Sequence, residues 1–147
     1  MKIIKQLMLA VTMLVSGIAF AQQTPESLAG VSLVSAKNAQ KMQEGGKALL
    51  VDTRVAVEFS EKSAKGAVNI VYREKSAKDV KFDRTQDKFD LDKLPKDKTF
   101  PVIFFCNAGE CWKSYKAAVL AVDAGYKNVY WMRGGMPEWV AAGLPTQ

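Results

Sequence analysis

The hydrophobic pattern centres on a continuous apolar run from Val102 to Phe105, which ends at Cys106. A short run without polar alternation is typical of a strand that is buried on both faces of a sheet. After a loop that contains Gly109, apolar residues recur at helical spacing and predict a helix that ends at Gly125. The residues expected on the buried face of this helix are Ala117, Leu120, Ala121 and Ala124.

Shorter apolar runs alternate with helical patterns through the rest of the chain. Ser35 is a good N-cap for a helix that ends at Gly45 and Gly46. Further strands are expected at residues 48–51, 66–71 and 127–132, and further helices at residues 55–59 and 136–142. Strands and helices that alternate with short connections are typical of an α/β fold with a parallel sheet.

Two segments lack such periodicity. Residues 22–30 are polar and contain Pro25, so we expect a flexible lead-in to one domain at residues 31–147. Residues 72–98 form a charged insertion whose few apolar anchors are Phe82, Phe89, Leu91 and Leu94. The simplest interpretation of the insertion is a solvated surface excursion that ends in a short helix near Leu91. The alternative is a long loop that lies over a functional site.

The N-terminus has the pattern of a secretory signal peptide at residues 1–21. Basic residues at Lys2 and Lys5 precede an apolar segment from Leu7 to Ile18, and Ala19-Phe20-Ala21 matches the small-x-small cleavage pattern. We expect cleavage after Ala21 and a periplasmic mature protein that is not stably inserted in a membrane. The alternative is an uncleaved anchor, for which the apolar run is short.

Composition narrows the possible chemistry. The chain has no histidine, which excludes Ser-His-Asp and Cys-His catalysis and removes the usual nitrogen ligand of zinc. We expect no metal site and no cofactor. Loss of Lys2 and Lys5 lowers the formal net charge from +6 to +4, and the remaining basic residues are interleaved with acidic ones. This charge pattern argues against a nucleic-acid partner and is compatible with a small anionic substrate.

Cys106 is the candidate nucleophile because it lies between the end of a strand and the start of a helix. Backbone N–H groups and the helix dipole at such a junction favour a thiolate or a bound anion. We expect the amides of residues 107–112 to surround its sulfur. The alternatives are a buried core cysteine, or a disulfide with Cys111 that is either structural or catalytic. Lys113 and Arg133 are candidate contacts for an anion.

Four stretches, in the right order, resemble the rhodanese-like family. They are Leu49–Arg54 with Glu58-Phe59, Lys65–Ile70, Phe104–Lys113, and Gly125–Tyr130 continuing through Arg133–Trp139 to Pro145. The resemblance covers the domain except for the charged insertion. It implies a three-layer α/β fold with a central, mostly parallel sheet and helices on both faces.

The resemblance also implies a chemistry. The first residue of the loop after the central strand, here Cys106, is the cysteine that forms a persulfide in the family. The substrate-binding loop then comprises Asn107, Ala108, Gly109, Glu110, Trp112 and Lys113. Its length matches the sulfur-transferring members, whereas related loops with one more residue act on phosphate or arsenate.

The chain departs from the family pattern at two positions. Cys111 stands at the sixth loop position, where sulfurtransferases of the family have a basic residue, and a histidine common before the second strand is absent, with Ser63 nearby. Cys111 is therefore a possible resolving thiol. The polar pair Asp52 and Arg54 is expected to be structural, and the side chains of Trp112, Tyr115 and Trp139 are expected to pack in the core.

The sequence supports three functions. The first is a sulfurtransferase that takes sulfur from a thiosulfate- or persulfide-type donor onto Cys106 and passes it to a thiophilic acceptor, such as a protein thiol. The second is a thiol–disulfide or persulfide redox protein that uses Cys106 and Cys111. The third is a non-catalytic rhodanese-like binding module.

Overall fold

The computed structural model describes residues 22–147, and the expected signal peptide at residues 1–21 lies outside this range. Within residues 22–147, no helix has the length and apolar character needed to cross a membrane.

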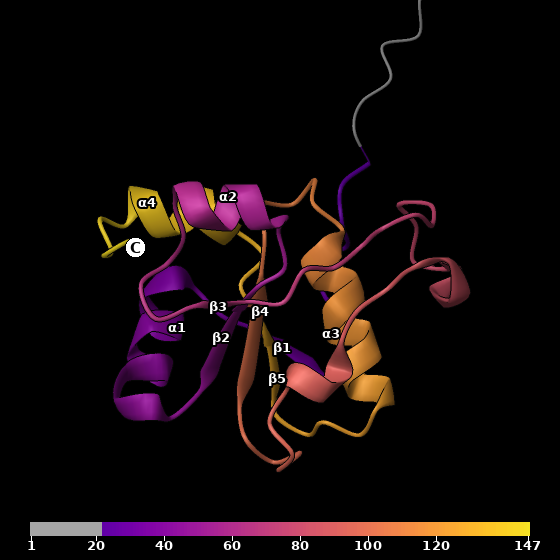
Figure 1. Cartoon of the computed structure of the whole chain (residues 1–147), viewed down its shortest axis with the longest axis horizontal. Helices are drawn as coiled ribbons and strands as arrows, with labels where there is room; N and C mark the ends of the chain where they lie inside the picture. Colours follow the sequence, from indigo (N-terminus) through magenta and orange to yellow (C-terminus); the bar gives the residue numbers. More distant parts are fainter. Residues whose placement is uncertain (1–21) are drawn as a thin grey trace, which may run out of the picture.

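A five-stranded parallel sheet forms the centre of the molecule (Figure 1). Its strands are β1 (Val31–Leu33), β2 (Leu49–Asp52), β3 (Val68–Asn69), β4 (Val102–Phe105) and β5 (Val129–Trp131). Their spatial order is β1-β5-β4-β2-β3, and all four pairings are parallel. The apolar run of β4 therefore lies in the middle of the sheet, as its lack of alternation predicts.

Helices cover both faces of this sheet. They are α1 (Ala36–Gln43), α2 (Ala56–Glu61), α3 (Lys113–Asp123) and α4 (Gly135–Ala141), with short 3-10 turns at Glu44–Gly46, Arg84–Gln86 and Leu91–Lys93. Figure 1 shows α1, α2 and α4 on one side and α3 on the other. The predicted three-layer α/β architecture is confirmed.

Alternate residues of β4 divide the core between the two faces. Ile103 and Phe105 pack with α1 and α4, in a cluster that contains Met136 and Trp139. Val102 and Phe104 pack with Ala117, Ala118 and Ala121 of α3. Leu120 and Ala124 are partly buried against the same cluster, so the predicted buried face of this helix is confirmed.

Local capping follows the sequence. Ser35 is the N-cap of α1, and its side chain accepts a hydrogen bond from the backbone N–H of Asn38 at 3.3 Å. Gly125 follows α3 with a φ of +93°, a conformation that residues with a Cβ rarely adopt. The carboxylate of Glu138 in α4 accepts a hydrogen bond from Ala36 N at 2.9 Å, which joins the starts of two helices.

The two segments without periodicity are more ordered than expected. The lead-in at residues 22–30 does not hang free: Thr24 is buried and hydrogen-bonded to Gly109, and Leu28 pairs with Val31. In the insertion at 72–98, Tyr72, Phe82 and Leu94 are buried. The insertion packs against the α3 side of the sheet through its predicted apolar anchors, and the predicted short helix near Leu91 is present as a 3-10 turn.

Candidate active site

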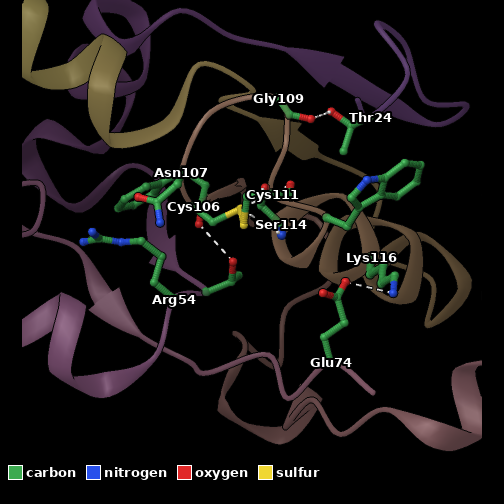
Figure 2. Close-up of a disulfide and its surroundings, with 12 residues drawn as sticks. Thr24, Arg54, Glu74, Cys106, Asn107, Gly109, Cys111, Ser114 and Lys116 are labelled. Carbon is green, nitrogen blue, oxygen red and sulfur yellow. Dashed lines mark hydrogen bonds and ion pairs between the residues drawn. A yellow bond between two sulfur atoms is a disulfide. The ribbon is translucent and has the colours of Figure 1, made fainter. Parts of the chain in front are cut away.

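Cys106 lies directly after β4, in the middle of the sheet's C-terminal edge, and is only 1% exposed. A disulfide joins it to Cys111, with the two Cα atoms 6.3 Å apart (Figure 2). This Cα–Cα distance is within the range of a disulfide, so two cysteines only five residues apart form the bridge that the sequence left open. Helix α3 begins two residues later, at Lys113, with Trp112 as an N-cap that makes no side-chain capping bond.

Ser114, in the first turn of α3, contacts the Cys106 sulfur twice. Its backbone N–H donates to Sγ at 3.4 Å, and its Oγ lies 3.1 Å from Sγ. The indole Nε1–H of Trp131 donates to the same Oγ at 3.0 Å, which leaves the Ser114 hydroxyl proton free to point at sulfur. Two donors are therefore directed at the position where a Cys106 thiolate would carry its charge.

This arrangement differs from the expected one. The backbone N–H that reaches the Cys106 sulfur comes from Ser114, and no amide of residues 107–112 donates to it in the part of the chain that is described. The amide of Cys111 instead donates to Ala108 O at 3.2 Å and closes a turn. The sequence could not predict the contact of Ser114 with the Cys106 sulfur. This contact depends on how closely the end of β4 approaches the start of α3.

The lead-in holds the cysteine loop from outside. Both the backbone N–H and the Oγ1–H of Thr24 donate to the carbonyl oxygen of Gly109 at 2.8 Å (Figure 2). The side chain of Gln23 donates to Glu110 at 3.1 Å, and the indole N–H of Trp112 donates to Gln22 O at 2.9 Å. The loop is thus bonded at its middle and at its end.

Arg133 supports the lead-in. Its guanidinium donates to the carbonyl oxygens of Thr24 at 2.7 Å and Pro25 at 3.0 Å, and lies against the ring of Trp131. Two of its nitrogens are thereby occupied, which favours a structural role over the hypothesis that Arg133 binds an anion.

The aromatic residues near the loop belong to the core, as expected. The rings of Trp112 and Tyr115 pack edge to face with their centroids 5.2 Å apart, and Tyr115 packs in the same way on Trp131. Trp139 belongs to the cluster on the other face of the sheet.

The opposite side of the loop is fixed by α2 and α4. The backbone N–H of Met136 donates to Cys106 O at 2.9 Å, and Gly135 precedes it with a φ of +58°. The side-chain amide of Asn107 donates to the Glu58 carboxylate of α2 at 2.8 Å. Two helices from distant parts of the sequence therefore position the first two residues of the loop.

A pocket of about 320 Å³ opens beside the loop. Its lining comprises Glu74, Lys78, Asn107, Ala108, Glu110, Cys111, Trp112 and Lys113. Most of the predicted substrate-binding loop is thus brought together, including Lys113. A larger hollow of about 590 Å³, between residues 69–73 and 87–93, contains no cysteine and lies away from this chemistry.

Glu74 and Lys78 show that the start of the insertion borders the pocket. Glu74 is held there by Lys116, which is fully buried in α3 and lies 2.8 Å from the Glu74 carboxylate (Figure 2). The Lys116 ammonium also donates to Ser76 Oγ and Ala77 O at 2.8 Å. No sequence pattern singles out Lys116 as the anchor of the insertion.

Asp87 completes this buried cluster and takes four hydrogen bonds. Donors are the Tyr72 hydroxyl, the Lys75 amide, and both the amide and the hydroxyl of Ser76. Burial alone would raise the pKa of Asp87, but the hydrogen bonds from Ser76, Lys75 and Tyr72 outweigh burial and lower it to about 2.

Within residues 22–147, no group of three metal-binding side chains forms.

Comparison with known proteins identifies the family of this chain. Residues 35–142 match the rhodanese-like domain. The chain belongs to this family. A thiosulfate sulfurtransferase GlpE from Actinobacillus succinogenes is 33% identical over 129 residues, which cover 88% of this chain and 92% of that protein.

A further relative and a solved structure are also similar to the chain. A thiosulfate sulfurtransferase GlpE from Glaesserella parasuis is 28% identical over 114 residues, covering 78% of this chain and 91% of that protein. The solved structure of a polysulfide-sulfur transferase homodimer from Wolinella succinogenes superposes with a TM-score of 0.58 at 23% identity, covering 81% and 80% of the two chains.

Ser63, which lies near the position of a histidine common in the family, belongs to a buried polar network with Asp52 and Arg54. Arg54 donates through Nε and a terminal nitrogen to the buried Asp52 carboxylate, with the shortest contact at 2.7 Å. Ser63 donates to the same carboxylate at 2.7 Å, and Arg54 also donates to Lys62 O at 2.7 Å. The pair ties the end of β2 to the segment before β3, and its predicted structural role is confirmed.

Proposed function

We propose that this chain, a rhodanese-type sulfurtransferase, carries sulfur on Cys106 as a persulfide. The observation that supports this role most directly is the pair of donors from Ser114 at the Cys106 sulfur. A thiolate and a persulfide anion are both stabilised by hydrogen-bond donors and by the N-terminus of a helix. The chemistry needs no histidine if the thiolate forms without a general base.

The catalytic cycle starts from the reduced protein. The Cys106 thiolate attacks the sulfane sulfur of the donor, the donor's sulfur–sulfur bond breaks, and the rest of the donor leaves with the electron pair. With thiosulfate the leaving group is sulfite; with a persulfide donor it is a thiolate. A thiophilic acceptor, such as a protein thiol, then attacks the outer sulfur and releases Cys106 as a thiolate.

The Cys106 persulfide can also react with Cys111. Its thiolate attacks the Cys106 sulfur, hydrosulfide leaves, and the Cys106–Cys111 disulfide seen in the structure results. This bridge would protect Cys106 from irreversible oxidation in an oxidising compartment. Cys111 also replaces the basic residue that would bind the anionic end of thiosulfate, so we assign that electrostatic role to Lys113 at the pocket.

A thiol–disulfide redox protein is the second candidate, favoured by the bridge itself. Intact mass of the reduced chain after incubation with thiosulfate or a small persulfide distinguishes the two functions. Sulfur transfer predicts a gain of one sulfur atom that cyanide removes, lost in Cys106→Ser and kept in Cys111→Ser. A loss of two hydrogens that needs both cysteines, together with no gain of sulfur in Cys111→Ser, supports the redox function instead, and no change with any donor leaves a binding module.

We also propose that the protein is exported and cleaved after Ala21. Sequencing the N-terminus of the protein from the periplasmic fraction tests this proposal. Gln22 is the expected first residue, and full-length protein in the cytosol would contradict export.

A further inference from the structure

The two cysteines of the disulfide are not equally exposed. Cys106 is 1% exposed and does not line the pocket, whereas Cys111 is half-buried and lines it. Figure 2 shows the bridge between Cys106 and Cys111, with Ser114 beside it. A molecule that enters the pocket therefore meets the Cys111 sulfur first.

The two sulfurs also differ as leaving groups. A thiolate attacks one sulfur of a disulfide and expels the other, and the sulfur with the lower thiol pKa leaves faster. Cys106 receives hydrogen bonds from Ser114 at 3.1 and 3.4 Å, whereas the Cys111 sulfur receives none in the described part of the chain. The Cys111 carbonyl oxygen lies 3.4 Å from the Cys106 sulfur, which carries no proton in the disulfide. Accessibility and leaving-group stabilisation therefore favour the same direction of attack.

We propose that the oxidised protein accepts hydrosulfide at Cys111 and converts it to sulfane sulfur. The proposal rests on the proposed sulfur-carrying role of Cys106, but adds a way of loading that needs no thiosulfate. The oxidant is the disulfide itself, which the structure contains. Hydrosulfide is the smallest thiolate, and a pocket of about 320 Å³ beside Cys111 admits it readily.

Atoms and electrons balance in two steps. Hydrosulfide forms a bond to the Cys111 sulfur, the Cys106–Cys111 bond breaks, and Cys106 leaves with the electron pair as a thiolate. Hydrosulfide is oxidised to the outer sulfur of a Cys111 persulfide, and the disulfide is reduced. The Cys106 thiolate then attacks that outer sulfur and expels Cys111 as a thiolate, which leaves the sulfur on Cys106.

The charges around the pocket suit a singly charged ligand. Two lysines, Lys78 and Lys113, share the lining with Glu74 and Glu110. The Glu74 carboxylate is ion-paired with Lys116 at 2.8 Å, and Glu110 accepts a hydrogen bond from Gln23 at 3.1 Å. The balance is close to neutral, so a monoanion such as hydrosulfide enters without a dedicated cationic partner, whereas a dianion such as thiosulfate depends on Lys113.

The test treats the purified, oxidised chain with one equivalent of sodium sulfide without oxygen, then quenches it with acid. The expected product is heavier by one hydrogen sulfide, and cyanide converts it to the dithiol with release of one equivalent of thiocyanate. Cys111→Ser and Cys106→Ser, which have no bridge, should bind no sulfur from sulfide. Ser114→Ala should load about tenfold more slowly, because a donor to the leaving thiolate is lost. Ser60→Ala, on the exposed surface of α2, is the matched control and should load at the normal rate.

The site of attack is tested with glutathione as the thiolate. After acid quenching, cleavage at Glu110 separates the two cysteines, and the adduct should be found on Cys111. A later shift of the adduct from Cys111 to Cys106 is the expected second step. An adduct that forms on Cys106 before any appears on Cys111 at the shortest quench times, or sulfide that yields a dithiol without bound sulfur, overturns the proposal. If the reduced chain still takes sulfur from thiosulfate in that case, the proposed sulfurtransferase function stands while this inference fails.

Discussion

The indole nitrogen of Trp131 donates to Ser114 Oγ at 3.0 Å, and Ser114 Oγ lies 3.1 Å from the Cys106 sulfur. The indole has one donor and no acceptor, so the direction of the first bond fixes the direction of the second. Trp131 ends β5, and Ser114 lies in the first turn of α3. The pairing of β4 with β5 therefore determines where the hydroxyl proton of Ser114 points.

Replacement of Ser114 by alanine should raise the pKa of the Cys106 thiol in the reduced protein. A hydrogen bond to a charged group contributes about 1.5–3 kcal/mol, which corresponds to about one to two pKa units. Thiolate absorbance and the rate of alkylation as functions of pH measure this shift in a Cys111→Ser background. Trp131→Phe, which frees the hydroxyl to rotate, should give a smaller shift in the same direction. An unchanged pKa in Ser114→Ala would show that the serine does not stabilise the thiolate.

Thr24→Val should loosen the cysteine loop without unfolding the domain. Valine fills the same volume but removes the hydroxyl bond to Gly109 O at 2.8 Å, while the backbone bond from residue 24 remains. We expect a loss of about 1 kcal/mol in the free energy of unfolding and faster hydrogen exchange at residues 107–112. Thr85→Val, at an exposed turn of the insertion, should leave exchange in the loop unchanged.

Most of the fold could be predicted from the sequence because its signals are local. The buried run of β4, the Ser35 cap and the end of α3 at Gly125 each depend on residues within a few positions. The strand β1 at Val31–Leu33 was missed. Two of its three residues are exposed, so it lacks the alternation of a half-buried strand and exists because it pairs with β5.

The sequence could predict only those residues of the candidate site that lie close together along the chain. Cys106, Cys111 and Lys113 share one loop, and the sequence placed them together. Ser114, Thr24 and Glu74 reach the loop through tertiary contacts across as many as 85 residues, as between Thr24 and Gly109. Neither periodicity nor composition reports such contacts. Residues 22–30 look flexible by composition because composition does not report their hydrogen bonds to the cysteine loop.

The buried cluster around Asp87 should make stability depend on acid. The pKa of Asp87 falls from its usual value of 3.8 to about 2 in the folded protein. Its contribution, about 2 kcal/mol, is therefore complete above about pH 4 and is lost as the pH falls towards 2. Urea unfolding across this range should show a shallower acid dependence in Asp87→Asn than in the unmodified protein. Asp92→Asn, on an exposed turn, is the control.

The cation of the same cluster supports both carboxylates. Lys116→Met should destabilise the protein by about 3–5 kcal/mol, because it leaves Glu74 and Asp87 without their buried partner. The double variant with Glu74→Gln should recover part of this loss. If the single variant unfolds no more easily than the unmodified protein, Lys116 does not anchor the insertion at the pocket.

Alanine substitutions at two glycines with left-handed backbone distinguish the effect of backbone strain from the effect of a steric collision with the cysteine loop. Gly135 has a φ of +58° and Gly143 a φ of +68°, so alanine strains the backbone at both, by about 1–2 kcal/mol. A Cβ at Gly143 meets nothing within 4 Å, whereas one at Gly135 would collide with the Cys106 carbonyl and lie 2.8 Å from Ala108 N.

Gly135→Ala should therefore cost more stability than Gly143→Ala, as measured by thermal unfolding. It should also displace Cys106 and slow sulfur loading by at least about tenfold, because misplacement of about 1 Å is enough for such losses. Gly143→Ala should load sulfur at the normal rate despite its strained backbone. Equal loading rates in the two variants would mean that the approach of α4 to the loop does not position the nucleophile.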